Sequence, residues 1–250
     1  MLGPLLTAVA TFRSVTAYLL VSLYILVVSP PGIVVALVMR RCEHLYWLAR
    51  QGCRFGLVLV GIRYRVTGTE YVDRERATVY CVNHASNIEP PVLYMALTAV
   101  HPKLKVLYKA EIHKIPLLSI VFDIAGFVPI ERGNREQSRM AIDAAAAALE
   151  KGDSFLVFPE GTRSWTGDLL PFKKGGFTMA VRGRAKIVPM IVLGTHQAMR
   201  KGSVIIRPAT ISVRIGVPIE STGLDERDAL SAATRTAMKD LLAAGPIQSA

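Results

Sequence analysis

Two short segments hold side chains whose types and spacing could do chemistry. In the first, Asn83 to Glu89, an imidazole (His84) stands five positions before a carboxylate. A carboxylate that accepts the Nδ1 proton of a histidine fixes its tautomer and leaves Nε2 free as a base. The spacing alone is weak, because a chain with five histidines and this many acids gives such a pair by chance roughly a third of the time. A surface imidazole followed by a glutamate in a first helical turn is the alternative.

The second segment, Phe158-Pro159-Glu160-Gly161-Thr162-Arg163-Ser164, is harder to explain as a turn. A turn needs the glycine but neither the glutamate nor the arginine. Arginine offers a planar fork that matches phosphate oxygens, and hydroxyls and backbone N–H groups can complete an anion site. A base for an alcohol and a loop for an anion together suggest acyl transfer onto a hydroxyl compound that carries a phosphate.

The surrounding sequence predicts the elements that position these segments. Residues 78–82 read as an apolar strand with Asn83 and His84 at its tip, and Pro90 and Pro91 open a helix that runs to about residue 100. Residues 155–158 read as a buried strand that ends at the second segment. Further strands are expected at 63–67, 105–108, 127–130, 187–193, 204–207 and 211–217, and further helices at 135–150, 172–184 and 229–244. This alternation predicts an α/β fold with a mixed, largely parallel central sheet flanked by helices.

An apolar N-terminus precedes this domain. Hydrophobic residues make up 51% of the 250-residue chain, and no charged residue occurs between Arg13 and Arg40. We expect Pro30-Pro31-Gly32 to interrupt the helix, which leaves a first arm of 16 residues, or about 24 Å, too short for a comfortable span. We therefore predict a helical hairpin in residues 1–60 that is embedded in one membrane leaflet, with a true span as the close alternative. Residues 61–250 form the α/β domain.

Charge indicates the sidedness and the partners. Only Arg13 precedes the apolar segment, whereas six arginines follow it: Arg40, Arg41, Arg50, Arg54, Arg63 and Arg65. Because the more basic flank of a membrane segment tends to stay in the cytosol, we predict that the rest of the chain is cytosolic. The formal net charge of +11 implies an anionic partner. The basic residues are spread along the chain without an aromatic–basic pattern, so no nucleic acid is expected. Three cysteines do not make a disulfide framework, and the histidines do not form a metal-ligand cluster.

The order of several motifs resembles the glycerolipid acyltransferase family, and specifically bacterial 1-acyl-sn-glycerol-3-phosphate (lysophosphatidic acid) acyltransferases. The matching positions are Asn83, His84 and Glu89 for Asn-His-x4-Asp; Gly126, Ile130 and Arg132 for Gly-x-x-x-Ile-x-Arg; Phe158 to Ser164 for Phe-Pro-Glu-Gly-Thr-Arg-Ser; Val188 to Val192 for a Val-Pro strand; and Lys109, Glu111 and Pro116 for a Lys-x-Glu…Pro segment. The departure is Glu89, where the family usually has Asp; the extra methylene still permits a hydrogen bond to the imidazole.

The resemblance implies an enzyme at the cytoplasmic face of the cell membrane, monotopic or single-pass, with lysophosphatidic acid as acceptor. Its co-substrate would be acyl-CoA or acyl carrier protein carrying the acyl group, with no cofactor and no metal, and its partners would include membrane phospholipids. The expected catalytic residues are His84 and Glu89, and the expected substrate-binding residues are Asn83, Lys109, Arg132, Glu160, Gly161, Thr162, Arg163 and Ser164. Three alternatives stay open: another acceptor, such as glycerol-3-phosphate, a different lysophospholipid or a lyso-aminolipid; a non-catalytic lipid-binding protein; and, from charge alone, a tethered nucleic-acid binder.

Overall fold

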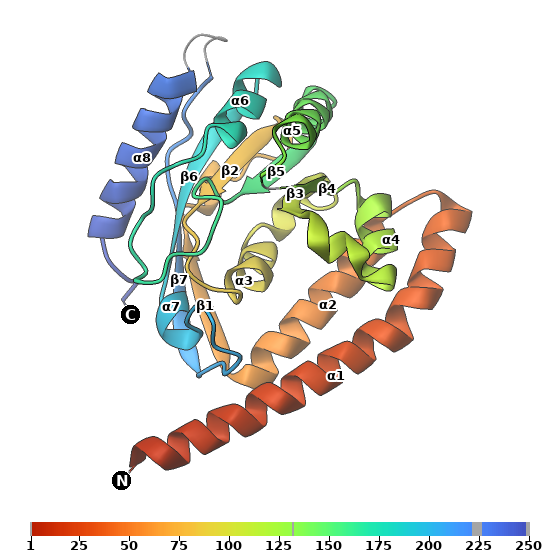
Figure 1. Ribbon diagram of the computed structural model, residues 1–250, viewed down its shortest axis with the longest axis vertical. Coiled ribbons are helices and arrows are strands. Elements are labelled where there is room, and N and C mark those ends of the chain that lie inside the picture. Colours follow the sequence, from red (N-terminus) through yellow and green to blue (C-terminus); the bar gives the residue numbers. More distant parts are fainter. Residues whose placement is uncertain (1, 132, 222–226, 249–250) are drawn as a thin grey trace.

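The protein has a seven-stranded sheet with helices on both faces, preceded by two long helices (Figure 1). The computed structural model describes residues 2–131, 133–221 and 227–248. The strand order is β1-β7-β6-β2-β5-β3-β4, and every neighbouring pair is parallel except β6 with β7. The predicted mixed, largely parallel α/β fold is therefore confirmed. The strands are β1 (Ile62–Thr67), β2 (Thr78–Val82), β3 (Leu104–Lys109), β4 (Val128–Ile130), β5 (Ser154–Val157), β6 (Lys186–Leu193) and β7 (Ala209–Ile215).

The two faces of the sheet carry separate hydrophobic cores. On β2, Tyr80 and Val82 point into one core and Val79 and Cys81 into the other, so the strand is apolar throughout. The first core is covered by α2 (Glu43–Val60) and α3 (Glu89–Ala96), and the second by α5 (Arg135–Glu150), α6 (Gly175–Arg182) and α8 (Arg227–Ala243). The other helices are α1 (Leu2–Met39), α4 (Pro116–Ala125), α7 (Thr195–Ala198) and the short 3-10 turns η1 (Thr69–Tyr71), η2 (Thr98–Val100) and η3 (Ala110–Lys114).

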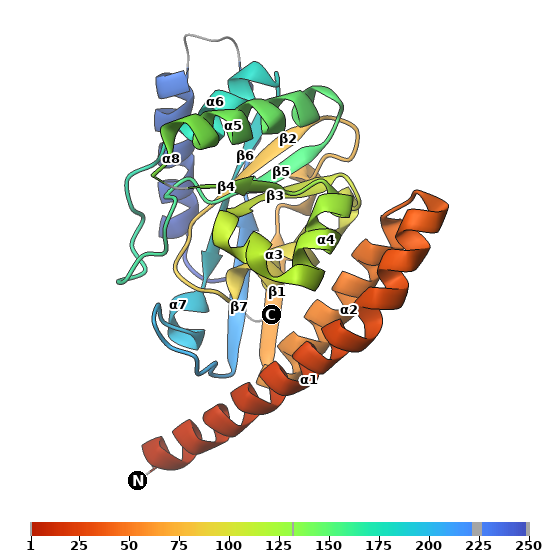
Figure 2. The same cartoon turned by 45° about the vertical axis from the view of Figure 1, so that its right-hand side comes forward.

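The helical hairpin is present, but its turn lies elsewhere than predicted. Helix α1 continues through Pro30 and Pro31 to Met39, and the chain turns at residues 40–42 before α2 begins (Figures 1 and 2). The prediction of a break at Pro30-Pro31-Gly32 was wrong, and so was the argument that the first arm is too short. At 38 residues α1 is about 57 Å long. By length and composition it could cross a membrane, and most of its side chains are exposed.

Packing against α2 explains why the two prolines do not end α1. The helices approach closely at two glycines of α2: a Cβ on Gly52 would lie 3.0 Å from the Tyr24 ring, and one on Gly56 would lie 3.2 Å from Val21. His44 Nε2 lies 2.7 Å from the Gly32 carbonyl oxygen. Each proline removes one backbone N–H donor from the helix. The contacts between α1 and α2 offset the free energy lost with those hydrogen bonds, because tertiary contacts can outweigh local helix propensity.

Elsewhere the predicted elements agree with the structure at the level of type and place. Strand β2 has the expected bounds, and Asn134 caps α5 through its side chain, which accepts from the N–H groups of Glu136 and Gln137. The prediction of a strand at 204–207 was wrong. That segment is irregular because its backbone is bonded to α1: Ile206 N–H donates to Ser14 Oγ (2.8 Å), and Tyr18 OH donates to the Val204 carbonyl (2.8 Å).

An ion pair attaches the loop before β2 to the start of β6. Lys186 Nζ lies 2.5 Å from Asp73 Oδ2, and the Lys186 side chain is almost fully buried. Asp73 Oδ1 also accepts hydrogen bonds from the N–H groups of Glu75 and Arg76. The hydrogen bond from Lys186 is the main cause that lowers the Asp73 pKa from 3.8 to about 2. The folded state therefore favours the charged carboxylate.

We predict that Asp73→Asn lowers the free energy of unfolding by about 2 kcal/mol at pH 7, since one pKa unit corresponds to about 1.4 kcal/mol. The folded pKa is the lower one, so the stabilisation is complete above about pH 4 and is lost as the pH falls toward 2. Urea unfolding at pH 7 and pH 2.5 measures both values. Asp240→Asn, at an exposed position of α8, is the control. An equal difference between wild type and Asp73→Asn at both pH values would contradict the prediction.

Candidate active site

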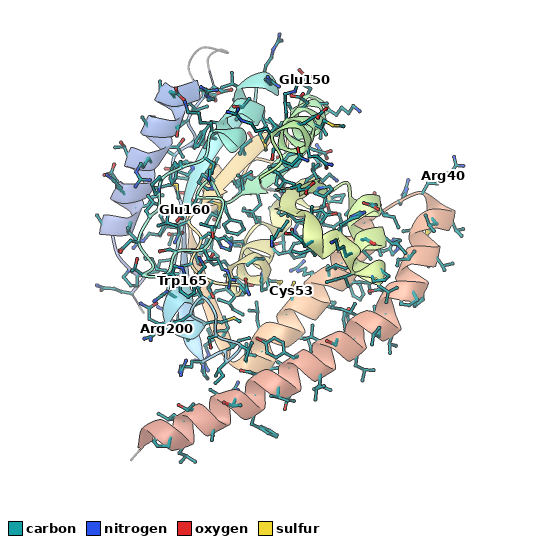
Figure 3. All side chains as sticks on the ribbon, in the orientation of Figure 1. Arg40, Cys53, Glu150, Glu160, Trp165 and Arg200 are labelled. Carbon is teal, nitrogen blue, oxygen red and sulfur yellow. The ribbon has the colours of Figure 1, made fainter. Side chains whose placement is uncertain are left out.

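The candidate site lies where β2, β5 and β6 end. Parallel strands place their carboxyl ends at one edge of the sheet, and in open α/β sheets ligands bind outside that edge. His84 follows β2, the Phe158–Ser164 loop follows β5, and Thr195 follows β6. The two segments singled out in the sequence therefore meet, although residues 90–157 lie between them in the chain. Figure 3 shows Glu160 and Trp165 on the loop between β5 and α6.

The His84 ring is fixed on two sides. Its Nδ1 lies 2.7 Å from Glu89 Oε2, and its ring stacks on Phe158 with centroids 4.0 Å apart. Among the described residues Nε2 has no hydrogen-bond partner, and His84 lines a cavity of about 690 Å³. The expected His84–Glu89 contact is thus present, with Nδ1 taken up by the carboxylate and Nε2 available.

Glu89 is fully buried and is held by donors from two loops. It accepts hydrogen bonds from the N–H groups of Ala85 (2.9 Å) and Ser86 (3.0 Å) and from Thr195 Oγ1 (2.7 Å). A buried carboxylate is tolerated when its lone pairs are satisfied in this way. Thr195 was missed in the sequence analysis because a single threonine after a strand has no distinguishing pattern.

Glu160 joins the two segments through the backbone. Its Oε1 accepts from His84 N–H (2.8 Å), and its Oε2 accepts from Leu170 N–H (3.0 Å). Burial is the main cause that raises the Glu160 pKa, and the two N–H donors act in the opposite direction. Both oxygens accept backbone hydrogen bonds, so Glu160 shapes the loop, and its expected contact with substrate stays a prediction.

Ser164 and Gly161 complete this backbone arrangement. Ser164 N–H donates to the His84 carbonyl (2.7 Å), and Ser164 Oγ accepts from Gly167 N–H (3.1 Å). Gly161 has a φ of +68°, and a Cβ there would lie 3.1 Å from the Lys173 side chain, so the turn after Phe158 requires glycine. These two residues also hold the loop.

The other expected binding residues divide into two groups. Thr162, Arg163 and Lys109 line the cavity with His84, although Lys109 is also paired with Glu111 at 2.8 Å. The Asn83 side chain instead bonds the backbone of Val192 on β6. Its Oδ1 accepts from Val192 N–H (2.7 Å) and its Nδ2 donates to the Val192 carbonyl (3.0 Å), so it links the ends of β2 and β6. In this structure Asn83 therefore holds the strand ends together, and its expected contact with substrate stays a prediction. Arg132 lies outside the described residues.

The cavity is mostly apolar, and Arg163 and Lys201, which contact each other, give it a basic side. Its walls come from α2, α3, β3 and α4 and include Tyr94, Leu104 and Phe122. Its cations include Lys109, Arg163 and Lys201, of which Lys201 was not singled out in the sequence. Within the described ranges no cluster of three or more His, Cys, Asp or Glu side chains is placed to hold a metal ion. The arrangement suits an amphiphile with an apolar tail and an anionic group.

We predict that the neutral His84 ring carries its proton on Nδ1, because the Glu89 carboxylate can only accept a hydrogen bond. The ¹⁵N chemical shifts of the labelled ring distinguish the two tautomers. In Glu89→Gln the preference should weaken, since the amide offers both a donor and an acceptor. A wild-type ring protonated on Nε2 would contradict the arrangement, and Glu111→Gln, away from the imidazole, is the control.

Comparison with known proteins agrees with this fold. A 1-acyl-sn-glycerol-3-phosphate acyltransferase of Cocos nucifera is 34% identical over 189 residues, which cover 72% of this chain and 60% of that protein. The protein of the same name from Borreliella burgdorferi is 27% identical over 73% of this chain and 72% of its own length. The chain spans about 60% of the length of the first plant relatives.

A solved structure shares the fold over nearly the whole chain. The crystal structure of the 1-acyl-sn-glycerophosphate acyltransferase PlsC from Thermotoga maritima superposes with a TM-score of 0.75 at 21% identity, covering 94% of this chain and 98% of the other. The model of the family described as Acyltransferase matches residues 63–193, which include the strand that delivers His84, the Phe158–Ser164 loop and β6. With more than half of its length matched, this chain belongs to the Acyltransferase family.

Proposed function

We propose that this protein transfers a fatty acyl group from acyl-CoA or acyl-ACP to the free hydroxyl of lysophosphatidic acid, giving phosphatidic acid. The observation that carries the proposal is the position of His84: Nδ1 is 2.7 Å from Glu89, and the ring opens onto a cavity that Arg163 also lines. The relatives named as 1-acyl-sn-glycerol-3-phosphate acyltransferases support the acceptor. The specific likeness to bacterial members remains a prediction, since the relatives include plants and a bacterium.

In the proposed reaction His84 acts as a general base. Its Nε2 removes the proton of the acceptor hydroxyl as the oxygen attacks the thioester carbonyl. The C–O bond forms, the C–S bond breaks, and the thiolate leaves with the proton that the imidazolium returns. Glu89 stabilises the imidazolium in the intervening state. The thiolate is a good leaving group, so no acyl-enzyme and no separate strong acid is required.

Arg163 and Thr162 would hold the acceptor phosphate at the basic side of the cavity. A guanidinium binds phosphate through two parallel hydrogen bonds, which fixes orientation as well as affinity. The apolar walls would receive acyl chain. Correct placement of hydroxyl and thioester near His84 supplies a large part of the rate enhancement in such reactions.

We further propose that residues 1–60 associate with the membrane, at its cytoplasmic face. The exposed apolar surface of α1 and the arginines at its turn, Arg40 and Arg41, support this. In Figure 3 Arg40 extends away from the α/β domain. Sedimentation with anionic phospholipid vesicles tests it, and recovery of all the protein in the supernatant would count against it.

We predict that His84→Ala reduces transfer by about 10²- to 10⁴-fold, the usual contribution of general-base catalysis. The measurement is labelled phosphatidic acid formed from labelled acyl thioester and lysophosphatidic acid. The unfolding temperature should stay close to that of the wild type, because Glu89 keeps its other three donors. Near-normal turnover by a folded His84→Ala variant would remove the general-base assignment. A panel of lyso-acceptors with one donor identifies the preferred acceptor.

We predict that Arg163→Ala raises the KM for lysophosphatidic acid by about 10- to 100-fold, the value of a charge-assisted hydrogen bond or a pair of them. Activity toward monoacylglycerol, which lacks the phosphate, should change little. Arg163→Lys should recover part of the loss, since it keeps the charge but not the fork. An unchanged dependence on the acceptor would show that Arg163 does not bind the phosphate.

A further inference from the structure

Lys201, which lies outside the family's motifs, also contacts the loop that carries Arg163. Lys201 follows α7, and its Nζ donates a hydrogen bond to the Arg163 carbonyl oxygen at 2.7 Å. The same Nζ lies 4.5 Å from the centroid of the Trp165 ring. One ammonium group therefore contacts the backbone of Arg163 and a side chain two residues further along.

These contacts act on a part of the loop that is also bonded to His84, but from another partner. Glu160 and Ser164 attach the loop to the backbone of His84, on the side of β2. Trp165 is 68% exposed, so Lys201 and the Gly202 backbone beneath the indole form much of its environment. The peptide between Arg163 and Ser164 is therefore bonded at both ends, with its N–H to His84 and its carbonyl to Lys201.

The backbone segment that follows Lys201 is held in place by hydrogen bonds. It returns to α7 through a hydrogen bond from Arg207 N–H to the Ala198 carbonyl (2.8 Å). Ser14 and Tyr18 of α1 bind the backbone of Ile206 and Val204 in the same segment. Because the backbone near Lys201 is fixed, the Lys201 side chain can restrict the movement of the loop that it contacts.

The charges in this place also fit an anionic ligand. Lys201 and Arg163 both line the cavity, and within the described part of the chain neither is paired with a carboxylate. Because neither cation has a carboxylate partner there, an anion in the cavity would be attracted by both. The guanidinium of Arg163 would supply the specific contact, because the Lys201 ammonium is already engaged with the loop.

We propose that Lys201 is a positioning residue that holds the Arg163 peptide and the Trp165 ring so that the Arg163 side chain faces the acceptor phosphate. The inference rests on the proposed function. Lys201 acts through Arg163, and its removal would misplace the guanidinium without removing it. The effect belongs to acceptor binding and not to proton transfer by His84.

Steady-state kinetics test the role in binding. Lys201→Met, which keeps the stem and removes the charge, should raise the KM for lysophosphatidic acid about 10-fold and change kcat less than about twofold, as expected for one charge-assisted hydrogen bond. Lys201→Arg should restore the KM to within about threefold, because a guanidinium can donate to the carbonyl and stack on the indole. Lys239→Met, at an exposed position of α8, is the control and should match the wild type. A wild-type KM in Lys201→Met would overturn the proposal.

A double-mutant cycle separates positioning from direct binding. If Lys201 acts through Arg163, then Lys201→Met should raise the KM less than about twofold in an Arg163→Ala background, because coupled residues are not additive. An undiminished 10-fold increase in that background would show that Lys201 binds the phosphate on its own. That result would replace the positioning role.

Amide hydrogen exchange gives a readout that does not depend on activity. Lys201→Met should speed exchange in peptides that cover residues 162–168, and Lys239→Met should not. Unchanged exchange would overturn the proposed grip on the loop, whatever the enzyme assays give. Faster exchange in a protein whose wild type forms no product from any acceptor would leave the grip supported and refute the proposed function instead.

Discussion

The site depends on a single buried carboxylate. Glu89 is the first residue of α3, is fully buried, and is surrounded by donors from the loop after β2 and the residue that opens α7. A buried carboxylate without donors would lower the free energy of unfolding by several kcal/mol, so the folded state is stable only with those donors in position. The same requirement fixes the His84 ring, which supplies the remaining contact at 2.7 Å. The fixed orientation of the His84 ring thus follows from the need to satisfy the buried Glu89 carboxylate.

A second set of bonds makes His84, the proposed base, and the Phe158–Ser164 loop one unit. The backbone N–H of His84 goes to Glu160, and its carbonyl accepts from Ser164, so both main-chain groups of His84 are bound to the Phe158–Ser164 loop. Phe158 stacks on the imidazole from the same loop. A displacement of the loop would therefore move the base as well. Preorganisation of this kind favours reactions that need two groups at a fixed separation.

Local sequence signals were sufficient for the elements that hold the site and insufficient for its supporting contacts. Strand β2 is a short apolar run that ends in polar residues, and such a pattern predicts a strand that is buried on both faces, as in a parallel sheet. The end of α1 could not be predicted in the same way, because contacts of α2 with Tyr24, Val21 and Gly32 overrule the prolines. Thr195 and Lys201 reach the site from segments with no motif, and the Asn83 contact with Val192 depends on the strand order. Those facts exist only in the folded chain.

The long apolar helix is part of the same structure and is not a separate appendage. Arg13 of α1 donates from Nε to the Leu59 carbonyl at 2.9 Å, where it satisfies an acceptor at the C-terminal end of α2 and complements the helix dipole. One residue later Ser14 accepts from Ile206, in the segment that supports Lys201. The proposed substrates have apolar tails that favour a bilayer and a phosphate that favours water. If α1 lies in the bilayer as proposed, its hydrogen bonds to residues 204–206 would hold the α/β domain and its cavity at the boundary between those two phases, where both substrates would be presented.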